Sequence, residues 1–103
     1  MNIKVFKMMN GEEIIGAVTA GSEVGYFLEN PATIMVQQNE QGQVGVGLAP
    51  YMPYVQGKVY IYKSAISSEG DPEPKMAKEY NRIFGSGIEV VPASALSGLK
   101  IVS

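Results

Sequence analysis

Lys-Met-Met-Asn-Gly-Glu-Glu-Ile-Ile-Gly-Ala-Val, residues 7–18, predicts two strands joined by a tight turn. Asn10-Gly11 is the strongest short-range signal for such a hairpin, because glycine takes a positive φ at no steric cost and asparagine tolerates one better than most residues. Strand-like runs flank the turn at residues 3–8 and 13–19. Gly16 interrupts the second run, and a glycine inside a strand indicates a bend, a bulge or the close approach of another backbone.

Three further strands are expected after the hairpin. Residues 24–37 form either two short strands or one long bent strand, because Pro31 has no amide hydrogen to give to a ladder. Residues 44–48 alternate Val, Val and Leu with two glycines, which predicts a strand with one face open to close approach or strong curvature. Residues 58–62 also alternate, and we expect this fifth strand to run on to Ile66.

One helix is expected near the end of the chain. Residues 67–70 break the strand pattern, and Asp71 then reads as an N-cap with Pro72 at the first helical position. The following residues place one apolar face at helical spacing, made of Met76, Tyr80, Ile83 and Phe84. Gly85 is expected to end this helix. We expect this face to cover the chain's own sheet or a neighbouring subunit, and residues 87–103 to form one or two short strands or a docked arm.

The composition excludes several classes of protein. With no cysteine and no histidine, the chain has no disulfide, no thiolate, and neither the commonest general base nor the commonest transition-metal ligand. It also lacks a recognisable nucleophile–base pair, so we expect no enzymatic activity, no metal site and no cofactor. No window reaches the roughly 18 apolar residues of a membrane span, and no signal peptide is evident. We therefore expect a cytoplasmic protein without a membrane partner.

The charges bear on the partners of this protein. Eight Lys and Arg residues against ten Asp and Glu residues give a net charge of −2, the opposite of the basic surface that grips duplex phosphates. This balance argues against duplex DNA as a partner. Charged residues make up only 17% of the 103-residue chain, and we expect copies of the protein to cover part of its surface in a homo-oligomer.

These features resemble the Sm-like (LSm) family, the small barrels of the Sm and LSm proteins and of the bacterial RNA chaperone related to them. The family's first motif resembles Met8-x-Asn10-Gly11-x-x-x-x-Gly16 and extends through Tyr26-Phe27-Leu28-Glu29-Asn30. Its second motif is similar in spacing to Ile61-Tyr62-Lys63-Ser64-Ala65-Ile66, with Tyr62 and Lys63 where the family has Arg and Gly. Phage-encoded Sm-like proteins are similar in overall layout, which would place the protein in a host cytoplasm.

The resemblance implies a mainly β protein. Its residues 1–68 would form a small five-stranded Sm-like (SH3-like) bent barrel, and residues 69–103 a C-terminal helix and extended tail packed on the barrel or on a neighbouring subunit. It also implies a homo-oligomeric ring, built by pairing the fourth strand of one copy with the fifth strand of the next. Single-stranded RNA bases would then lie near the central hole.

The resemblance also implies candidate RNA-binding residues. By position these are Asn30 and Lys63, with Tyr62 or Tyr26 available to stack on a base. An alternative of another class uses the same ring only as an assembly or adaptor module that binds no nucleic acid. The net charge and the missing Arg-Gly pair favour this alternative, whereas the family resemblance favours RNA binding. The tyrosines and lysines of the second half also have an ordinary interpretation, as packed aromatic rings and surface charges.

Overall fold

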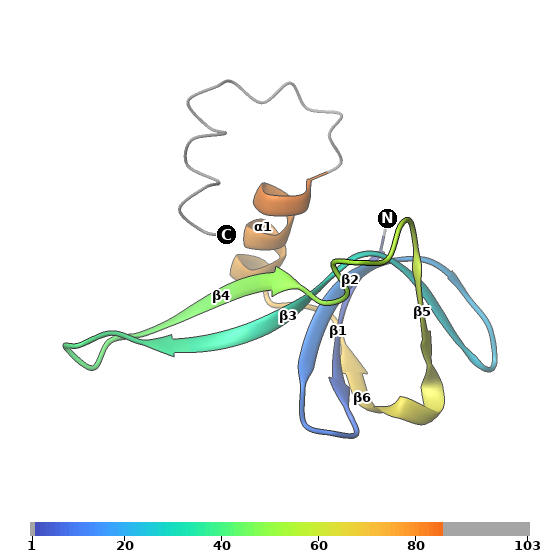
Figure 1. Ribbon diagram of the computed structural model, residues 1–103, viewed down its shortest axis with the longest axis horizontal. Coiled ribbons are helices and arrows are strands. Elements are labelled where there is room, and N and C mark those ends of the chain that lie inside the picture. Colours follow the sequence, from blue (N-terminus) through green and yellow to red (C-terminus); the bar gives the residue numbers. More distant parts are fainter. Residues whose placement is uncertain (1, 86–103) are drawn as a thin grey trace.

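The computed structural model describes residues 2–85, which form a mainly β protein with one antiparallel sheet and one helix (Figure 1). The strands are β1 (Asn2–Met8), β2 (Glu13–Gly21), β3 (Gly25–Gln38), β4 (Val44–Pro50), β5 (Val59–Tyr62) and β6 (Ile66–Gly70). A 3-10 turn, η1 (Lys63–Ala65), joins β5 to β6, and the helix α1 (Pro74–Phe84) follows. Within residues 2–85, no helix has both the length and the apolar character needed to cross a bilayer. The strands or docked arm expected at residues 87–103 lie outside the described residues.

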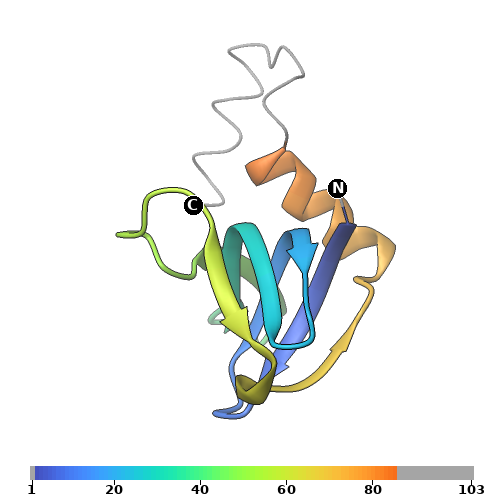
Figure 2. The same cartoon turned by 90° about the vertical axis from the view of Figure 1, so that its right-hand side faces the viewer.

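The strands follow one another across the sheet in the order β4-β3-β2-β1-β6, and β5 also pairs with β3. β5 pairs with the first residues of β3, at Gly25–Leu28, whereas β4 pairs with the later residues from Ala32 to Gln38. β4 and β5 therefore lie along one side of β3, at one end of the sheet. The three residues of η1 then carry the chain to β6 at the other end. So short a connection requires the sheet to curl, and it is strongly curved in both ribbon views (Figures 1 and 2).

The hairpin predicted at Asn10-Gly11 is confirmed. The Gly11 amide donates to the Met8 carbonyl oxygen at 2.9 Å, and Gly11 has a φ of 93°. Asn10 contributes its side chain, because its Oδ1 atom accepts a hydrogen bond from the Glu12 amide at 2.9 Å. This is a turn followed by one left-handed glycine, so only one of the two residues needs the positive φ.

β3 is one long bent strand, and two residues account for its bend. The register between β2 and β3 shifts at Gly16, where an added Cβ would lie 3.1 Å from the Leu28 side chain and 3.4 Å from the Pro31 backbone. On β3 itself, Asn30 takes a φ of 48°, in the left-handed region that asparagine tolerates. The bend that Gly16 and Pro31 indicated in the sequence is therefore confirmed.

Three details of the prediction are wrong. The sheet has six strands rather than five, because residues 67–70, expected to break the pattern, form β6 together with Ile66 and pair with β1. The fifth strand does not run on to Ile66, since η1 interrupts it at Lys63. The helix begins at Pro74 with Glu73 as N-cap, instead of beginning at Pro72 with Asp71 as N-cap. Proline suits the first turn of a helix in either position, and pairing of β6 with β1 keeps the chain extended as far as Gly70.

Two apolar clusters lie on opposite faces of the curved sheet. The first fills the concave side and consists of Phe6, Met8, Ile14, Leu28, Val59 and Ile61. The second lies between the sheet and α1 and consists of Ile15, Ala17, Ala32, Leu48 and Tyr80. Met76, Ile83 and Phe84 of α1 pack against the second cluster. The apolar helix face thus covers the chain's own sheet, which was one of the two expected positions.

Candidate functional site

The structure brings two of the four candidate RNA-binding residues together at the start of η1. The Nζ atom of Lys63 lies 5.1 Å from the centroid of the Tyr26 ring, a cation–π distance. The Lys63 amide also donates to the Val24 carbonyl oxygen at 2.8 Å, which fixes the turn next to β3. Lys63 and Tyr26 are therefore neighbours because the turn between β5 and β6 is tied to the beginning of β3.

The Tyr26 side chain is held by a network of charges. Its hydroxyl donates to the two carboxylate oxygens of Glu69 in β6, at 2.9 and 2.8 Å. The hydrogen bond to Glu69, with smaller contributions from burial and the Glu69 charge, raises the pKa of Tyr26 above its usual value of 10.0. Lys4 balances this carboxylate, with its Nζ atom 3.9 Å from Glu69 and 3.7 Å from Asp71. Tyr26 thus links β3 to β6.

This network leaves little of the Tyr26 ring for a ligand. Lys63 lies over the ring, and the Phe6 ring packs against it with centroids 5.4 Å apart. The Glu69 carboxylate next to its hydroxyl would repel a phosphate group. The arrangement therefore favours a structural role for Tyr26 over base stacking.

Tyr62 lies on the opposite face of the sheet from Tyr26. Gly25 pairs with Tyr62 and Tyr26 with Ile61, and successive residues of a strand point to opposite faces. Tyr62 consequently shares its face with Phe27 and Tyr60. Ring centroids are 4.6 Å apart between Phe27 and Tyr60, and 5.0 Å apart between Tyr60 and Tyr62, in edge-to-face contacts. We call Phe27, Tyr60 and Tyr62 the outer aromatic row.

The outer aromatic row is accessible at both ends and fixed in its middle. Phe27 is 43% exposed and Tyr62 is 56% exposed. The Tyr60 hydroxyl lies 3.0 Å from the Ser22 Oγ atom. Gly25 makes room for the Tyr60 ring, because a Cβ atom there would lie 2.8 Å from the ring and 2.3 Å from the Ile61 carbonyl oxygen. A planar group could stack on these exposed rings without any rearrangement of the strands.

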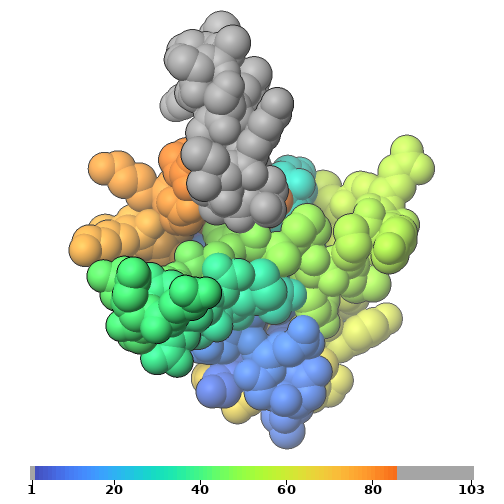
Figure 3. Space-filling model, turned by 60° about the vertical axis from the view of Figure 1, so that its left-hand side comes forward, coloured from blue at the N-terminus to red at the C-terminus, as the bar shows by residue number. Residues whose placement is uncertain are grey.

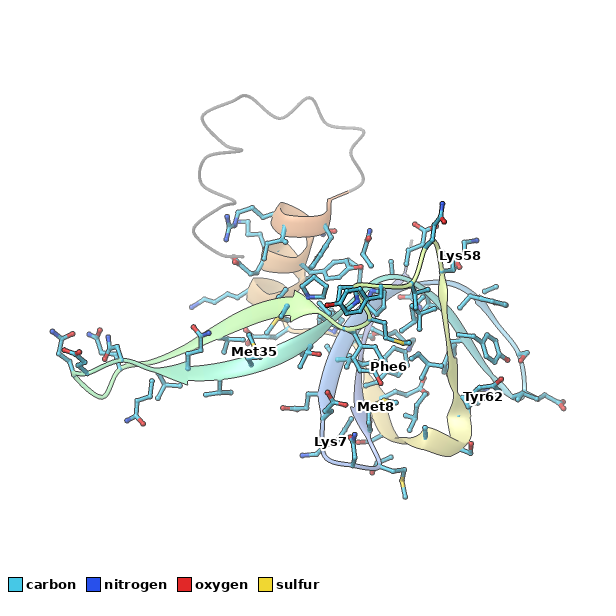
Figure 4. All side chains as sticks on the ribbon, viewed as in Figure 1. Phe6, Lys7, Met8, Met35, Lys58 and Tyr62 are labelled. Atoms are coloured by element: carbon cyan, nitrogen blue, oxygen red, sulfur yellow. The ribbon has the colours of Figure 1, made fainter. Side chains whose placement is uncertain are left out.

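Two lysines flank the strand that carries the row. Lys58 precedes β5 and Lys63 follows it, and both side chains are exposed. Figure 4 shows Lys58 and Tyr62 at opposite ends of β5. The Nζ atom of Lys63 lies over the Tyr26 ring, on the face opposite to the row, so the two lysines do not act on the row together.

Asn30 lies apart from the other three candidates. It is four positions from Tyr26 along β3, a distance of about 13 Å at the usual rise of a strand. Its backbone carbonyl oxygen accepts a hydrogen bond from Tyr80 of α1 at 3.0 Å. Asn30 therefore belongs to the bend beneath the helix, and its conformation explains the residue type without a ligand.

Sequence reasoning missed Phe27. The alternation of β3 predicts that Phe27 and Tyr26 point to opposite faces, but only the pairing of β3 with β5 places Phe27 next to Tyr60.

Two other tyrosines of the second half, Tyr51 and Tyr54, lie in different environments. Tyr51 packs against the first apolar cluster, and burial followed by the Glu12 charge raises its pKa, whereas Tyr54 is fully exposed in the loop before β5.

The chemistry open to this site is the binding of flat or anionic groups. Among the described residues, no three His, Cys, Asp or Glu side chains are grouped so that they could hold a metal ion.

In comparisons with known proteins, no family model matches the chain and no curated protein matches its sequence. The geometry of residues 2–85 and the motif resemblance therefore carry the functional argument.

Proposed function

We propose that this protein folds as a bent barrel of the Sm-like kind and that copies of it form a ring. In this proposal the ring binds single-stranded RNA by stacking bases on the exposed side chain of Tyr62. The observation that carries the ring is the presence of free strand edges at both ends of the sheet. Among the described strands, β4 and β5 pair only with β3, and β6 pairs only with β1. An unpaired edge is a template for another strand, and pairing two different edges of identical copies closes into a ring when the rotation allows it.

The strand order supports the bent-barrel part of the proposal. A single curved antiparallel sheet, whose last two strands are joined by a 3-10 turn, is compatible with a small barrel of the Sm-like kind. The early glycine turn, Gly16 in β2 and the bend at Asn30 are the devices by which short strands curl. They coincide with positions of the first family motif.

The partner edge in the ring is β6. The family pattern suggested pairing of the fourth strand with the fifth, but here β5 is followed by η1 and a separate sixth strand. β6 lies at the end of the sheet opposite to β4, so pairing these two edges continues the sheet from one copy to the next, whereas β5 lies on the same side of β3 as β4 does. In the proposed ring, β4 of one copy pairs with β6 of the next.

Exposed aromatic rings support the RNA part of the proposal. Tyr62 replaces the arginine of the second family motif, and its ring is 56% exposed beside Tyr60. Stacking of one base on an aromatic side chain contributes roughly 1–3 kcal/mol and tolerates any base. Lys58 and Lys63 add two positive charges per copy, and a ring would repeat them around its axis.

An assembly or adaptor module without nucleic-acid binding is the second candidate. The Tyr26 hydroxyl is taken by Glu69, and Lys63 lies over the Tyr26 ring, so both residues already have partners within the chain. The net charge of −2 favours the same candidate. Both candidates share the ring, and they differ only in whether RNA binds.

The ring is tested by the variant Ser67→Pro. Ser67 has no partner in the register between β1 and β6, and Ile66 before it has φ −100° and ψ 125°, which a following proline accepts. The substitution removes the amide donor of Ser67, and the register pairs between β6 and β1 do not include this residue. We expect light scattering at micromolar concentration to give an oligomer for the wild type and for Ser67→Ala, and a smaller species for Ser67→Pro. A monomeric wild type would overturn the ring.

RNA binding is tested by fluorescence anisotropy with short oligo-U and oligo-A at low and physiological salt. We expect Tyr62→Ala to weaken binding by roughly 1–3 kcal/mol with little change in salt dependence, because stacking releases few counterions. Lys63→Glu should instead remove the salt-dependent part. Tyr54→Ala is the matched control, since Tyr54 is exposed but lies outside the row. An intact wild-type ring that binds neither oligonucleotide at low salt would leave the assembly module as the function.

A further inference from the structure

The turn between β1 and β2 carries the sequence Asn10-Gly11, the one place in the chain where a glycine follows an asparagine. The backbone nitrogen of the residue after an asparagine can attack the asparagine side chain, and glycine hinders this attack least because it has no side chain. Both residues are exposed. In the space-filling view the β1–β2 hairpin, in blue, lies at the surface on the end of the molecule away from α1 (Figure 3). Water therefore reaches this turn.

The folded turn keeps the attacking nitrogen protonated. The Gly11 amide donates to the Met8 carbonyl oxygen at 2.9 Å. The Gly11 nitrogen must lose its proton before it can form a new bond, and a hydrogen-bonded amide gives up its proton chiefly when the local structure opens. The closed hairpin should therefore suppress the attack.

Glu12 holds the Asn10 side chain at both of its polar atoms. The Asn10 Oδ1 atom accepts a hydrogen bond from the Glu12 amide at 2.9 Å, and the Asn10 Nδ2 atom donates to the Glu12 carboxylate at 3.1 Å. These two hydrogen bonds restrict the rotation by which the side-chain carbon could approach the Gly11 nitrogen. Opening of the turn therefore has to precede any reaction at Asn10.

We propose that Asn10 is a site of deamidation, which the closed hairpin suppresses and an open hairpin permits. In the open turn the Gly11 nitrogen loses its proton to water and bonds to the Cγ atom of Asn10. The bond from Cγ to Nδ2 breaks, and the leaving nitrogen takes up a proton and departs as ammonia. Water then opens the resulting succinimide ring at either carbonyl carbon, which gives aspartate or isoaspartate. The reaction consumes one water and releases one ammonia, so it needs no other reactant.

Either product changes the turn. Isoaspartate adds one atom to the backbone at position 10, because the chain then runs through the former side chain, and the spacing that lets Gly11 reach the Met8 carbonyl oxygen is lost. Aspartate keeps the backbone but places a second carboxylate where the Asn10 amide donated to Glu12. Two carboxylates at hydrogen-bonding distance repel each other. The modified turn is therefore less stable than the original one.

The turn is tied to the segment that follows Tyr62. The Met9 amide donates to the Ala65 carbonyl oxygen of η1 at 2.8 Å, and η1 begins directly after Tyr62. Deamidation at the neighbouring Asn10 should therefore loosen the hold of the hairpin on η1. The chemistry belongs to the turn alone, so the proposal goes beyond the proposed ring and RNA site and does not depend on either of them.

The test follows the amide of Asn10 in the folded and in the unfolded full chain. The wild type is incubated at mildly alkaline pH with and without denaturing guanidinium chloride, and peptide mass spectrometry with fragmentation measures the converted fraction at each asparagine. We expect Asn10 to convert about tenfold more slowly in the folded protein, because the reaction waits for opening of the turn. Asn10→Ser, whose hydroxyl can still accept from the Glu12 amide, is the matched control and should show no conversion at position 10.

Glu12→Ala tests the protection separately from the site. It removes the carboxylate that accepts from Asn10 Nδ2 and keeps the backbone amide of residue 12. We expect deamidation of the folded protein to become about threefold faster, the effect of losing one hydrogen bond, with no change in denaturant. A folded wild type that reacts as fast as the unfolded chain would overturn the protection. An Asn10 that stays intact in denaturant would overturn the site itself.

Discussion

The hydroxyl of Tyr80 in α1 donates to the backbone carbonyl oxygen of Asn30 at 3.0 Å, and also to that of Glu29 at 2.8 Å. Tyr80 is buried in the cluster between helix and sheet. Among residues 2–85, Asn30 is the one non-glycine residue that has a positive φ. The helix therefore donates to two backbone carbonyl groups at the bend of β3, which couples α1 to the curvature of the sheet.

The first prediction concerns this contact. Tyr80→Phe removes the hydroxyl and leaves two carbonyl oxygens without their partner, so the free energy of unfolding should fall by about 1–3 kcal/mol. The measurement is the urea midpoint at unchanged m-value. Tyr54→Phe, at a fully exposed position, should leave the midpoint unchanged. Equal midpoints for wild type and Tyr80→Phe would show that the hydrogen bonds contribute nothing net.

The second prediction is a loss of stability in alkali. Burial is the main cause that raises the pKa of Tyr80 from 10.0 to about 12. The unfolded chain thus loses this proton at lower pH than the folded chain does. The contribution of neutral Tyr80 is complete below pH 10 and is lost as the pH rises from 10 towards 12, at about 1.4 kcal/mol per pH unit at most.

Urea unfolding at several pH values between 8 and 12 measures this effect. Wild-type stability should fall more steeply above pH 10 than that of Tyr80→Phe, which has no hydroxyl to ionise at this position. Tyr26, whose pKa is also raised, adds a slope of the same sign to both proteins. Parallel curves for the two proteins would contradict the assignment to Tyr80.

The third prediction concerns the room beneath Tyr60. Gly25→Ala would put a Cβ atom 2.3 Å from the Ile61 carbonyl oxygen and 2.8 Å from the Tyr60 ring, so β5 or the ring must move. We expect a loss of about 1–3 kcal/mol in stability, as for other overpacked sites. Gly45→Ala is the control, because no described atom lies within 4 Å of a Cβ atom there.

Thermal unfolding of the two glycine variants, followed by circular dichroism, makes the comparison. If the proposed RNA site is the outer aromatic row, Gly25→Ala should also weaken oligonucleotide binding, whereas Gly45→Ala should not. A Gly25→Ala protein as stable as the wild type would mean that β5 adjusts to the methyl group without cost.

The fourth prediction separates the structural role of Asn30 from a role in RNA binding. Asn30→Gly keeps the left-handed conformation accessible and should leave stability equal or higher, whereas Asn30→Val should cost about 1–2 kcal/mol, because a β-branched residue resists a φ of 48°. Chemical denaturation ranks the three proteins. Oligonucleotide affinity should be the same for wild type and Asn30→Gly, and a selective loss of binding by Asn30→Gly would return Asn30 to the site.

The sequence by itself determined the features that depend on neighbours along the chain. Gly11 supplies the positive φ of the first turn, and Gly16 marks the shifted register of β2. The helical spacing of Met76 and Tyr80 identified the buried face of α1. These predictions held because backbone sterics and side-chain periodicity act within a few residues.

Tertiary structure decided what depends on pairing between distant segments. Residues 67–70 carry little strand signal, yet pairing with β1 makes them part of β6, which ends at Gly70. Pairing of β3 with β5 likewise puts Phe27 beside Tyr60, and leaves Tyr26 on the other face with Glu69 of β6. The sequence identified tyrosines as candidates for base stacking, but it could not assign each of them to a face of the sheet. A shift of one residue in register exchanges the two faces of a strand.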